Sequence, residues 1–386
     1  MRQPTDSERE IIVSELFGKE LACWASSAKF SSYFDHYCSI VCPASSQHGD
    51  AVIELDTILL QAHSDVLRCA QIIFQQPKIT FDQFAETIAM QSGLQDVSPK
   101  EKEHLARVTV EVCFAINCMR RDYCSPYLQR RGIHRTKWEG DICLVFFVEA
   151  AFKTIASESE TGNRNTTHWQ KPAWSAAGSL KSIKAWKLVK RYGIKIRGTN
   201  DLLEHLDLDL KTMTLKVFHQ VSFLRGHLSK TKDASLNLSF EESVKRGSLP
   251  PALILETLLT FHDILFPIAS IRDKKSRVLL NTMIAKHSFD AEAKWIEFVR
   301  PIPEDMSFDY WGDRLAALYK VVQKPPPTNA LVAWFERHTS ERNALTVAIV
   351  GLFLSVLFGL LSFIVGLLQL ILAWVAYRNP PEGRRD

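Results

Sequence analysis

Residues 343–377 read NALTVAIVGLFLSVLFGLLSFIVGLLQLILAWVAY and contain no charged residue and no proline. Leu, Val, Ile, Phe, Ala and Gly make up most of this stretch. A bilayer core requires about 20 consecutive apolar residues in a helix, and this run is longer. The sequence therefore predicts a transmembrane segment over 343–377, followed by a short tail, 378–386.

The length of the run fits either one long, tilted helix or a helical hairpin that turns near Gly359. Each half of such a hairpin would contain about 16 to 18 residues and span roughly 24 to 27 Å, slightly less than the bilayer core. The run also lacks the Asn-Gly, Pro-Gly or Asp-Gly pairs that usually mark a tight turn. We expect one helix, with the hairpin as the alternative.

Small residues, together with one glutamine, recur along this segment at spacings of four and three. Their mean spacing is about 3.6 residues, which places them on one face of a helix. Small side chains allow close backbone approach between membrane helices, so this stripe predicts self-association. Packing on another protein or on the soluble region is the alternative. The positions are Ala344, Ala348, Gly351, Ser355, Gly359, Ser362, Gly366, Gln369 and Ala373.

Aromatic residues flank the apolar run, as expected where a helix crosses the membrane surface. Trp374 and Tyr377 lie near its end, and Trp334 precedes it. Arginines occur on both sides, so the positive-inside rule gives no orientation. A stretch with three prolines, 325–342, forms a stiff spacer and membrane-entry segment.

The N-terminus shows no apolar run of the kind found in secretory signals. We therefore expect a single-pass protein whose N-terminal region is cytosolic, at an endomembrane or at the plasma membrane. The eight cysteines should then be thiols. The glycosylation sequons at Asn165 and Asn237 should remain unmodified.

The region before the anchor has the composition of a globular protein, with 46% hydrophobic and 23% charged residues. A polar stretch with Gly and Pro, 156–178, predicts a linker between two mainly helical domains, 1–155 and 179–324. The predicted fold class is mainly α, with a short strand at 214–218. The formal net charge of +4 is far below that of a dedicated nucleic-acid binder.

Capping patterns predict helices in the first domain. Thr80 with Gln83, Ser98 with Glu101, and Thr136 with Glu139 have capping-box spacing. The apolar periodicity that accompanies these pairs predicts helices over 50–76, 99–121 and 139–155. In the second domain, helices are expected over 249–267, 273–287 and 309–322, with a short capped helix in 199–206.

The stretch 179–197, SLKSIKAWKLVKRYGIKIR, alternates lysines with apolar residues. One interpretation is a basic amphipathic helix at an anionic membrane surface. The other is a solvated helix that packs its apolar side on the domain. The second is favoured, because lysines spaced by three move around a helix rather than marking one face.

Several stretches, taken together, resemble a large family of uncharacterised membrane proteins of filamentous fungi. The resemblance covers about residues 194–377 and implies a helical cytosolic region and a hydrophobic tail, without implying an activity. The stretches are RGTNDLLEHLDLD, LKVFHQVSFLRGHL, LPPALILETLLTFHDILFP, GDRLAALYKVVQKPPP and HTSERNALTVAIVGLF.

Two residue groups resemble catalytic or metal sites but lack the required spacing. His36, Cys38, Cys42 and His48 have wider cysteine separations than structural zinc sites and no paired second half. The set Ser222, His219 and Asp201 has no nucleophile elbow around it. No phosphate-binding loop or dinucleotide fingerprint follows a predicted strand. We therefore expect no metal, no cofactor and no enzymatic site.

These observations favour a membrane-anchored, non-enzymatic adaptor or interaction protein of unknown process. The alternative is a component of a membrane transporter or channel with the layout of CorA-type magnesium channels. That family has two spans with a Gly-Met-Asn loop between them. Residues 343–377 contain no methionine, so this signature is absent.

Overall fold

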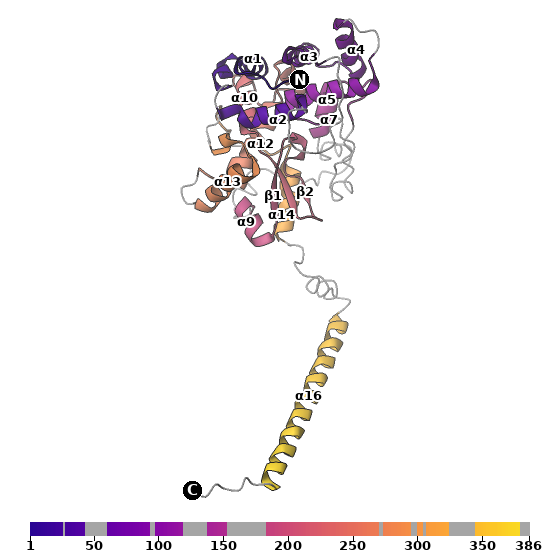
Figure 1. The fold of residues 1–386 in the computed structure, drawn as a ribbon, viewed down its shortest axis with the longest axis vertical. Coiled ribbons are helices and arrows are strands. Elements are labelled where there is room, and N and C mark those ends of the chain that lie inside the picture. Colours follow the sequence, from indigo (N-terminus) through magenta and orange to yellow (C-terminus); the bar gives the residue numbers. More distant parts are fainter. Residues whose placement is uncertain are drawn as a thin grey trace. The chain divides into compact units, whose positions relative to one another are not determined.

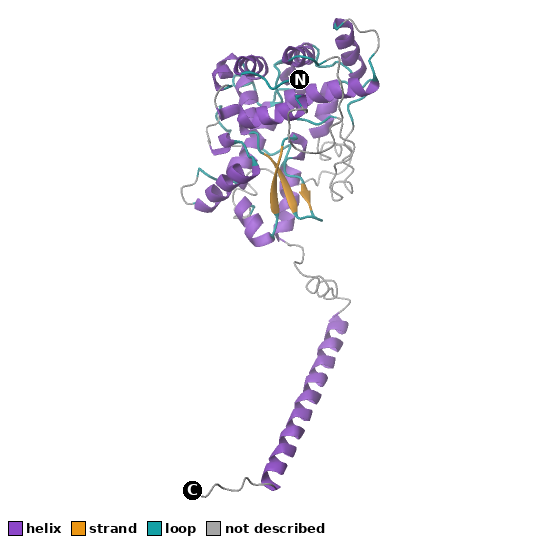
Figure 2. Ribbon diagram, in the orientation of Figure 1, coloured by secondary structure: helices purple, strands orange, loops and turns teal. Residues whose placement is uncertain are grey.

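The computed structural model describes a mainly helical protein with one three-stranded sheet (Figures 1 and 2). The mainly α fold class is thereby confirmed. The chain divides into two compact units, 1–323 and 324–386. The described residues are 1–25, 28–42, 60–92, 97–118, 137–152, 183–269, 273–294, 299–303, 306–323 and 344–378.

The first part of the chain forms helices at the predicted capping signals. Thr80 accepts a hydrogen bond from the Gln83 amide, and Ser98 accepts one from the Glu101 amide, as predicted. The third predicted cap, Thr136, lies outside the described residues. The helices are α1 Asp6–Phe17, η1 Lys19–Trp24, η2 Ala28–Phe30, α2 Ser31–Val41, α3 His63–Gln75, α4 Phe81–Gln91, α5 Pro99–Phe114 and α7 Leu144–Phe152.

Two of these helices are shorter than predicted, for local backbone reasons. Helix α5 ends at Phe114 rather than at 121, because Ala115 adopts a left-handed conformation with φ 52°. Helix α7 begins at Leu144 rather than at 139, after a turn in which Gly140 has φ 59°. The start predicted for α3, at residue 50, falls outside the described residues.

The sheet contains one predicted strand and two that the sequence analysis missed. Strand β3, Thr214–Phe218, pairs in parallel with β1, Lys195–Thr199, and antiparallel with β2, Leu208–Asp209. The helix considered for 179–197 is therefore wrong at its C-terminal end. Helix α9 covers only Ala185–Tyr192, because Gly193 adopts φ 66° and the chain then extends into β1.

Helices follow the sheet as the apolar runs predicted. Asp273 caps α13, and the apolar run after Pro250 continues from α12 into a π-helical turn, η7. The elements are η6 Leu202–Glu204, α10 Val221–Lys230, α11 Phe240–Lys245, α12 Pro251–Leu259, η7 Thr260–Leu265, α13 Lys274–His287, η8 Ala291–Lys294 and α14 Gly312–Gln323.

The two predicted domains share one hydrophobic core in the 1–323 unit. Helix α1 packs on α10, and α11 packs on both α3 and α7. At the first contact, a Cβ atom on Gly226 would come within 2.7 Å of the Phe17 ring, so this position requires glycine. The sequences on both sides of the predicted linker therefore complete a single compact unit. The linker itself, 156–178, lies outside the described residues.

The second unit contains α16, Ala344–Arg378, a continuous helix of 35 residues. At 1.5 Å per residue it is about 52 Å long, more than the bilayer core requires. The helix passes through Gly359 without interruption, so the single helix is confirmed and the hairpin is not formed.

Candidate functional site

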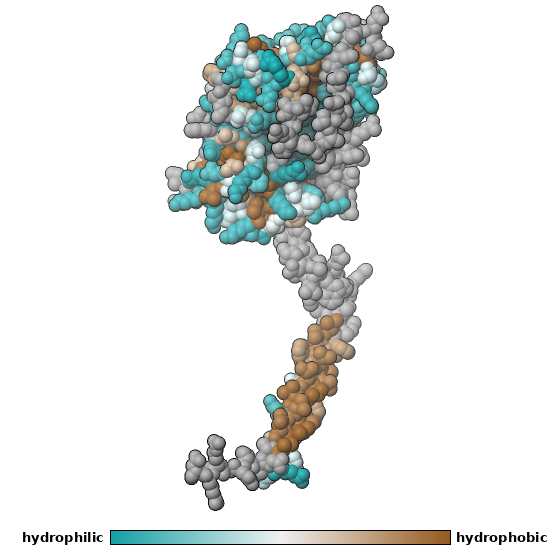
Figure 3. All heavy atoms as spheres, in the orientation of Figure 1, coloured by the Kyte–Doolittle hydropathy of each residue, from teal (hydrophilic) through white to brown (hydrophobic). Residues whose placement is uncertain are grey.

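The largest exposed apolar surface among the described residues belongs to α16 (Figure 3). Residues Val350–Val375 form a stretch of 26 residues that is long and apolar enough to cross a membrane, and none of it is buried. Trp374 and Tyr377 are exposed at its C-terminal end, with the Arg378 guanidinium 5.8 Å from the Trp374 ring. Trp334, the aromatic expected at the other end, lies outside the described residues.

The predicted small-residue stripe lies entirely within α16. Added Cβ atoms on Gly351, Gly359 and Gly366 would meet no atom within 4 Å, so the stripe is open at these three glycines. The Ser355 hydroxyl donates to the Gly351 carbonyl at 2.9 Å, which satisfies this donor inside the helix. The stripe therefore allows a second helix to come close to its backbone, while the Ser355 donor is already used within α16.

In the suggested zinc group, the Cys38 and Cys42 side chains share a hydrogen bond, but the described residues do not form a metal site. His36 and Cys38 lie on α2, where positions two apart point in different directions. Burial lowers the pKa of His36 to about 4. The Cys42 thiol donates to the Arg2 carbonyl at 3.0 Å, and His48 lies outside the described residues. Within the described parts of the chain, no cluster of three or more His, Cys, Asp or Glu residues could hold a metal ion.

The suggested triad is also separated, and a different carboxylate takes part. The Ser222 amide and hydroxyl both donate to Asp290 Oδ2 at 2.7 Å, so Asp290 caps the start of α10. The Asp290 amide in turn donates to His219 Nδ1 at 3.2 Å. Asp201 instead accepts from the Leu203 amide in η6. Ser222 is fully buried, so this group is a structural network without access for a substrate.

His205 forms a second buried network, which ties the sheet to η7 and α14. Its Nδ1 accepts from the Phe218 amide at 3.2 Å, and its Nε2 bonds the Thr260 hydroxyl at 2.7 Å. Burial, followed by the nearby Arg314 guanidinium, lowers the pKa of His205 to about 3. The imidazole is therefore neutral at physiological pH, with its hydrogen on Nε2.

Glu256 organises the turn that leads into α14. Its carboxyl oxygens accept hydrogen bonds from the backbone amides of Asp309, Tyr310 and Trp311 at 2.9, 2.9 and 3.1 Å. The Trp311 indole donates to the neighbouring Thr257 hydroxyl at 2.8 Å. The networks around His205 and Glu256 each join residues that are distant in the sequence. The side chains in both networks therefore hold the fold together.

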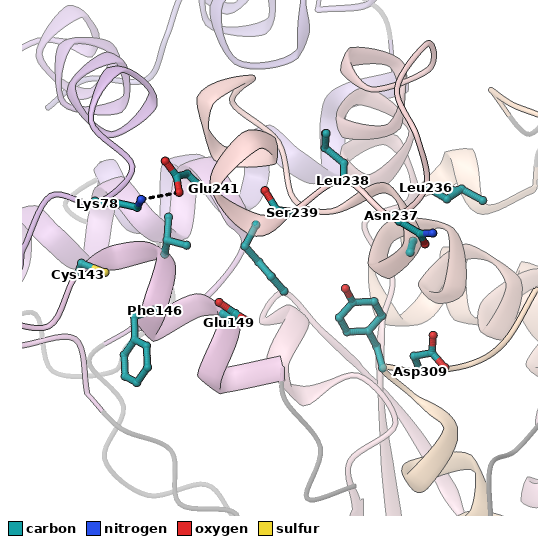
Figure 4. Close-up of a pocket in the computed structure, with 14 residues that line it drawn as sticks. Lys78, Cys143, Phe146, Glu149, Leu236, Asn237, Leu238, Ser239, Glu241 and Asp309 are labelled. Atoms are coloured by element: carbon teal, nitrogen blue, oxygen red, sulfur yellow. Dashed lines mark ion pairs between the residues drawn. The ribbon is translucent and has the colours of Figure 1, made fainter. Parts of the chain in front are cut away.

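An open hollow of about 580 Å³ lies where α7 and α11 face the turn before α14 (Figure 4). Lys78 and Glu241 form an ion pair of 2.8 Å on one side, and hydrogen bonds from Lys78 and Lys245 lower the pKa of Glu241. Phe146 is 60% exposed beside it. The described lining also contains Glu149, Asp309 and Tyr310, so the hollow is polar as well as apolar. The sequence analysis did not find this hollow, because its walls come from distant segments.

Comparisons with protein-family models, with curated proteins and with solved structures give no match. The resemblance to fungal membrane proteins stays a prediction.

Proposed function

We propose that this protein is a membrane-anchored, non-enzymatic adaptor, in which α16 spans a bilayer and the 1–323 unit binds other proteins. The observation that carries this proposal is the exposed apolar surface of Val350–Val375. Apolar surface in contact with water costs about 25 cal/mol per Å², so a fully exposed helix of this composition requires lipid or protein around it. A bilayer surrounds the whole circumference of α16 with apolar lipid chains.

The continuity of α16 supports a single-pass anchor, and the cytosolic placement of the N-terminal region rests on the sequence of the N-terminus. A channel of the CorA-type layout needs two spans, whereas the described residues contain one helix of suitable length. Within the described part of the 1–323 unit, Asp201 does not join Ser222 and His219, and no cluster suited to a metal ion forms, which favours binding over catalysis. The hollow beside Phe146 offers a place for a segment of a partner.

Proximity labelling in cells tests the adaptor function. The full chain, a chain that lacks 344–378, and the variant Phe146→Ser should label three different sets of neighbours. Ile11→Ser is the matched control, because Ile11 is 52% exposed on α1 and does not line the hollow. Identical neighbour sets for all four proteins would contradict the proposal.

Membrane attachment gives a separate prediction. The full chain should stay in the pellet after high-salt and carbonate washing, and deletion from Asn343 onward should release it. Asn237 is exposed in the structure and serves as a native reporter, which should remain unglycosylated if this region is cytosolic. Release of the full chain by carbonate would exclude a spanning helix. An endoglycosidase-sensitive mass shift would show that the region around Asn237 lies in the secretory lumen and not in the cytosol.

Self-association of α16 through the small-residue stripe is a further part of the proposal. Replacing Gly351 or Gly359 with Leu should weaken dimer crosslinking in membranes, because the added side chain separates the two backbones. Leu354→Ala and Leu361→Ala, which lie off the stripe, should leave crosslinking unchanged. Equal effects of the two pairs would show that the stripe is not the contact face.

A further inference from the structure

Helices α9 and α13 form a surface without acidic residues. They pack on each other, and Lys184, just before α9, forms an ion pair with Asp273 at the start of α13. Asp273 is buried and also accepts a hydrogen bond from the Ser276 amide, so Lys184 and this amide balance its charge inside the fold. The sequences 183–199 and 274–287 contain no other Asp or Glu. These two segments therefore carry a positive net charge.

Six basic side chains on these helices are exposed: Lys190, Arg191, Lys274, Lys275, Arg277 and Lys286. No ion pair joins Lys190, Arg191, Lys274 or Lys275 to another residue in the described ranges. Strand β1, an edge strand next to α9, adds further basic residues at alternate, exposed positions. We call the exposed surface of α9 and the first turns of α13 the basic face.

The basic face also carries exposed apolar groups. Val189 on α9 and Val278 on α13 are 40% and 65% exposed. The Lys275 ammonium lies 4.5 Å from the ring of Trp186, which is partly exposed. Basic residues mixed with valines and an amphipathic indole are typical of surfaces that rest on the headgroup region of a bilayer.

The position of this face in the 1–323 unit agrees with a membrane partner. Helix α9 and the C-terminal end of α14 lie at the same end of the unit (Figure 1). The chain leaves α14 at Gln323 and enters α16 at Ala344. The intervening stretch, 324–343, can extend over at most about 70 Å. A bilayer that holds α16 is therefore within reach of the end that carries the basic face.

We propose that the basic face binds the headgroups of anionic phospholipids in the membrane that holds α16. This inference rests on the proposed anchor. Each basic residue close to an anionic leaflet strengthens association by about fivefold, so the loss of two should weaken it about 25-fold. Salt should weaken it as well, because exposed charges are screened over about 10 Å at 0.1 M ionic strength.

Hydrogen exchange of the full chain in lipid nanodiscs tests this proposal. Amides of α9 and α13 should exchange more slowly in discs with 30% phosphatidylserine than in phosphatidylcholine discs, and 0.5 M salt should remove the difference. The variant Lys190→Gln with Lys274→Gln should lose most of the protection. The matched control is Lys19→Gln with Lys100→Gln, which removes two exposed lysines from η1 and α5 and should retain it.

Failure of the anchor and failure of the basic face are distinguishable here. A chain that does not enter the discs and stays in the soluble fraction contradicts the anchor. A chain that enters both kinds of disc, with equal exchange of α9 and α13 in the two, overturns the lipid-binding face alone. Equal loss of protection in the control variant also overturns it. Protection by poly-glutamate without any response to phosphatidylserine overturns it too, and would indicate an acidic protein as the partner.

Discussion

Lowering the pH from 7 to 4.5 is expected to remove most of the stability of the 1–323 unit. Burial lowers the pKa of seven histidines in this unit, which are His36, His63, His104, His205, His219, His227 and His262. The pKa falls to about 4 for His36, His219 and His262 and to about 3 for His205. In the folded protein these four histidines are mostly unprotonated at pH 5.

The unfolded chain behaves differently, because a solvated histidine has a pKa near 6.5. Between pH 6.5 and 4.5 each of these residues is protonated when unfolded and neutral when folded. Their stabilising contribution is therefore complete above pH 6.5 and is lost as the pH falls toward the folded pKa. Each histidine costs about 3 kcal/mol over this interval, against a typical total stability of about 5 to 15 kcal/mol.

Two carboxyl groups oppose this loss in part. Burial raises the pKa of Asp290 to about 6 and that of Glu256 to about 8. These groups bind protons in the folded state before they do so in the unfolded chain, so acidification favours folding at both positions. Seven histidines with a lowered pKa against two carboxyls with a raised pKa still leave net destabilisation in acid.

His205 shows why protonation is costly in atomic terms. Its Nδ1 accepts the Phe218 amide, so a proton added there would face another donor at 3.2 Å. The ring is fully buried, with the Trp311 ring 5.0 Å away, and no water can stabilise the new charge. Opening this site would separate β3 from η7 and α14 together.

Urea unfolding of the detergent-solubilised chain at several pH values measures this effect. The buried indoles of Trp138 and Trp311 report on the 1–323 unit by fluorescence. His205→Gln should reduce the slope of stability against pH by about 1.4 kcal/mol per pH unit, the value for one proton. The exposed control His287→Gln should leave the slope unchanged. A wild-type stability that is flat from pH 7 to 4.5 would contradict the prediction.

Local signals in the sequence predicted the elements that depend on neighbouring residues. The caps at Thr80 and Ser98, the strand at 214–218 and the apolar helix over 343–377 all follow from side chains within a few positions. Strand β1 was missed because its five residues follow a basic helix without a break in pattern except Gly193. Its strand character comes from pairing with β3, which the sequence does not reveal locally.

The interior networks could not be predicted from the sequence either, because they join residues that are far apart in the chain. Glu256 and Tyr310 are 54 positions apart, and Ser222 and Asp290 are 68 apart. A triad assembled from sequence therefore paired Ser222 with the wrong carboxylate, Asp201. The division into two domains failed because the polar stretch between them does not indicate that α1 packs on α10.

Replacement of Glu256 by Leu is expected to cost about 4 kcal/mol of stability, since a buried amide without a partner costs about 1 to 3 kcal/mol. Three amides lose their acceptor at once, those of Asp309, Tyr310 and Trp311. Glu256 is only 1% exposed, so water cannot easily replace it. Part of the loss is recovered if the turn before α14 moves toward solvent.

Glu256→Gln separates hydrogen bonding from packing. Glutamine keeps the shape and one carbonyl oxygen, but its amide group presents a donor to a backbone donor, so we expect about half the loss. Glu10→Leu and Glu10→Gln are the controls, because Glu10 is exposed on α1 and each change should cost less than about 0.5 kcal/mol. Urea unfolding at pH 7 measures all four variants. If Glu256→Leu came within 1 kcal/mol of wild type, the three hydrogen bonds would not hold α14 to α12.

Amide exchange gives a second measurement. Loss of the three hydrogen bonds should loosen α14, the last described helix before α16, and should raise amide exchange in Gly312–Gln323 before the rest of the unit unfolds.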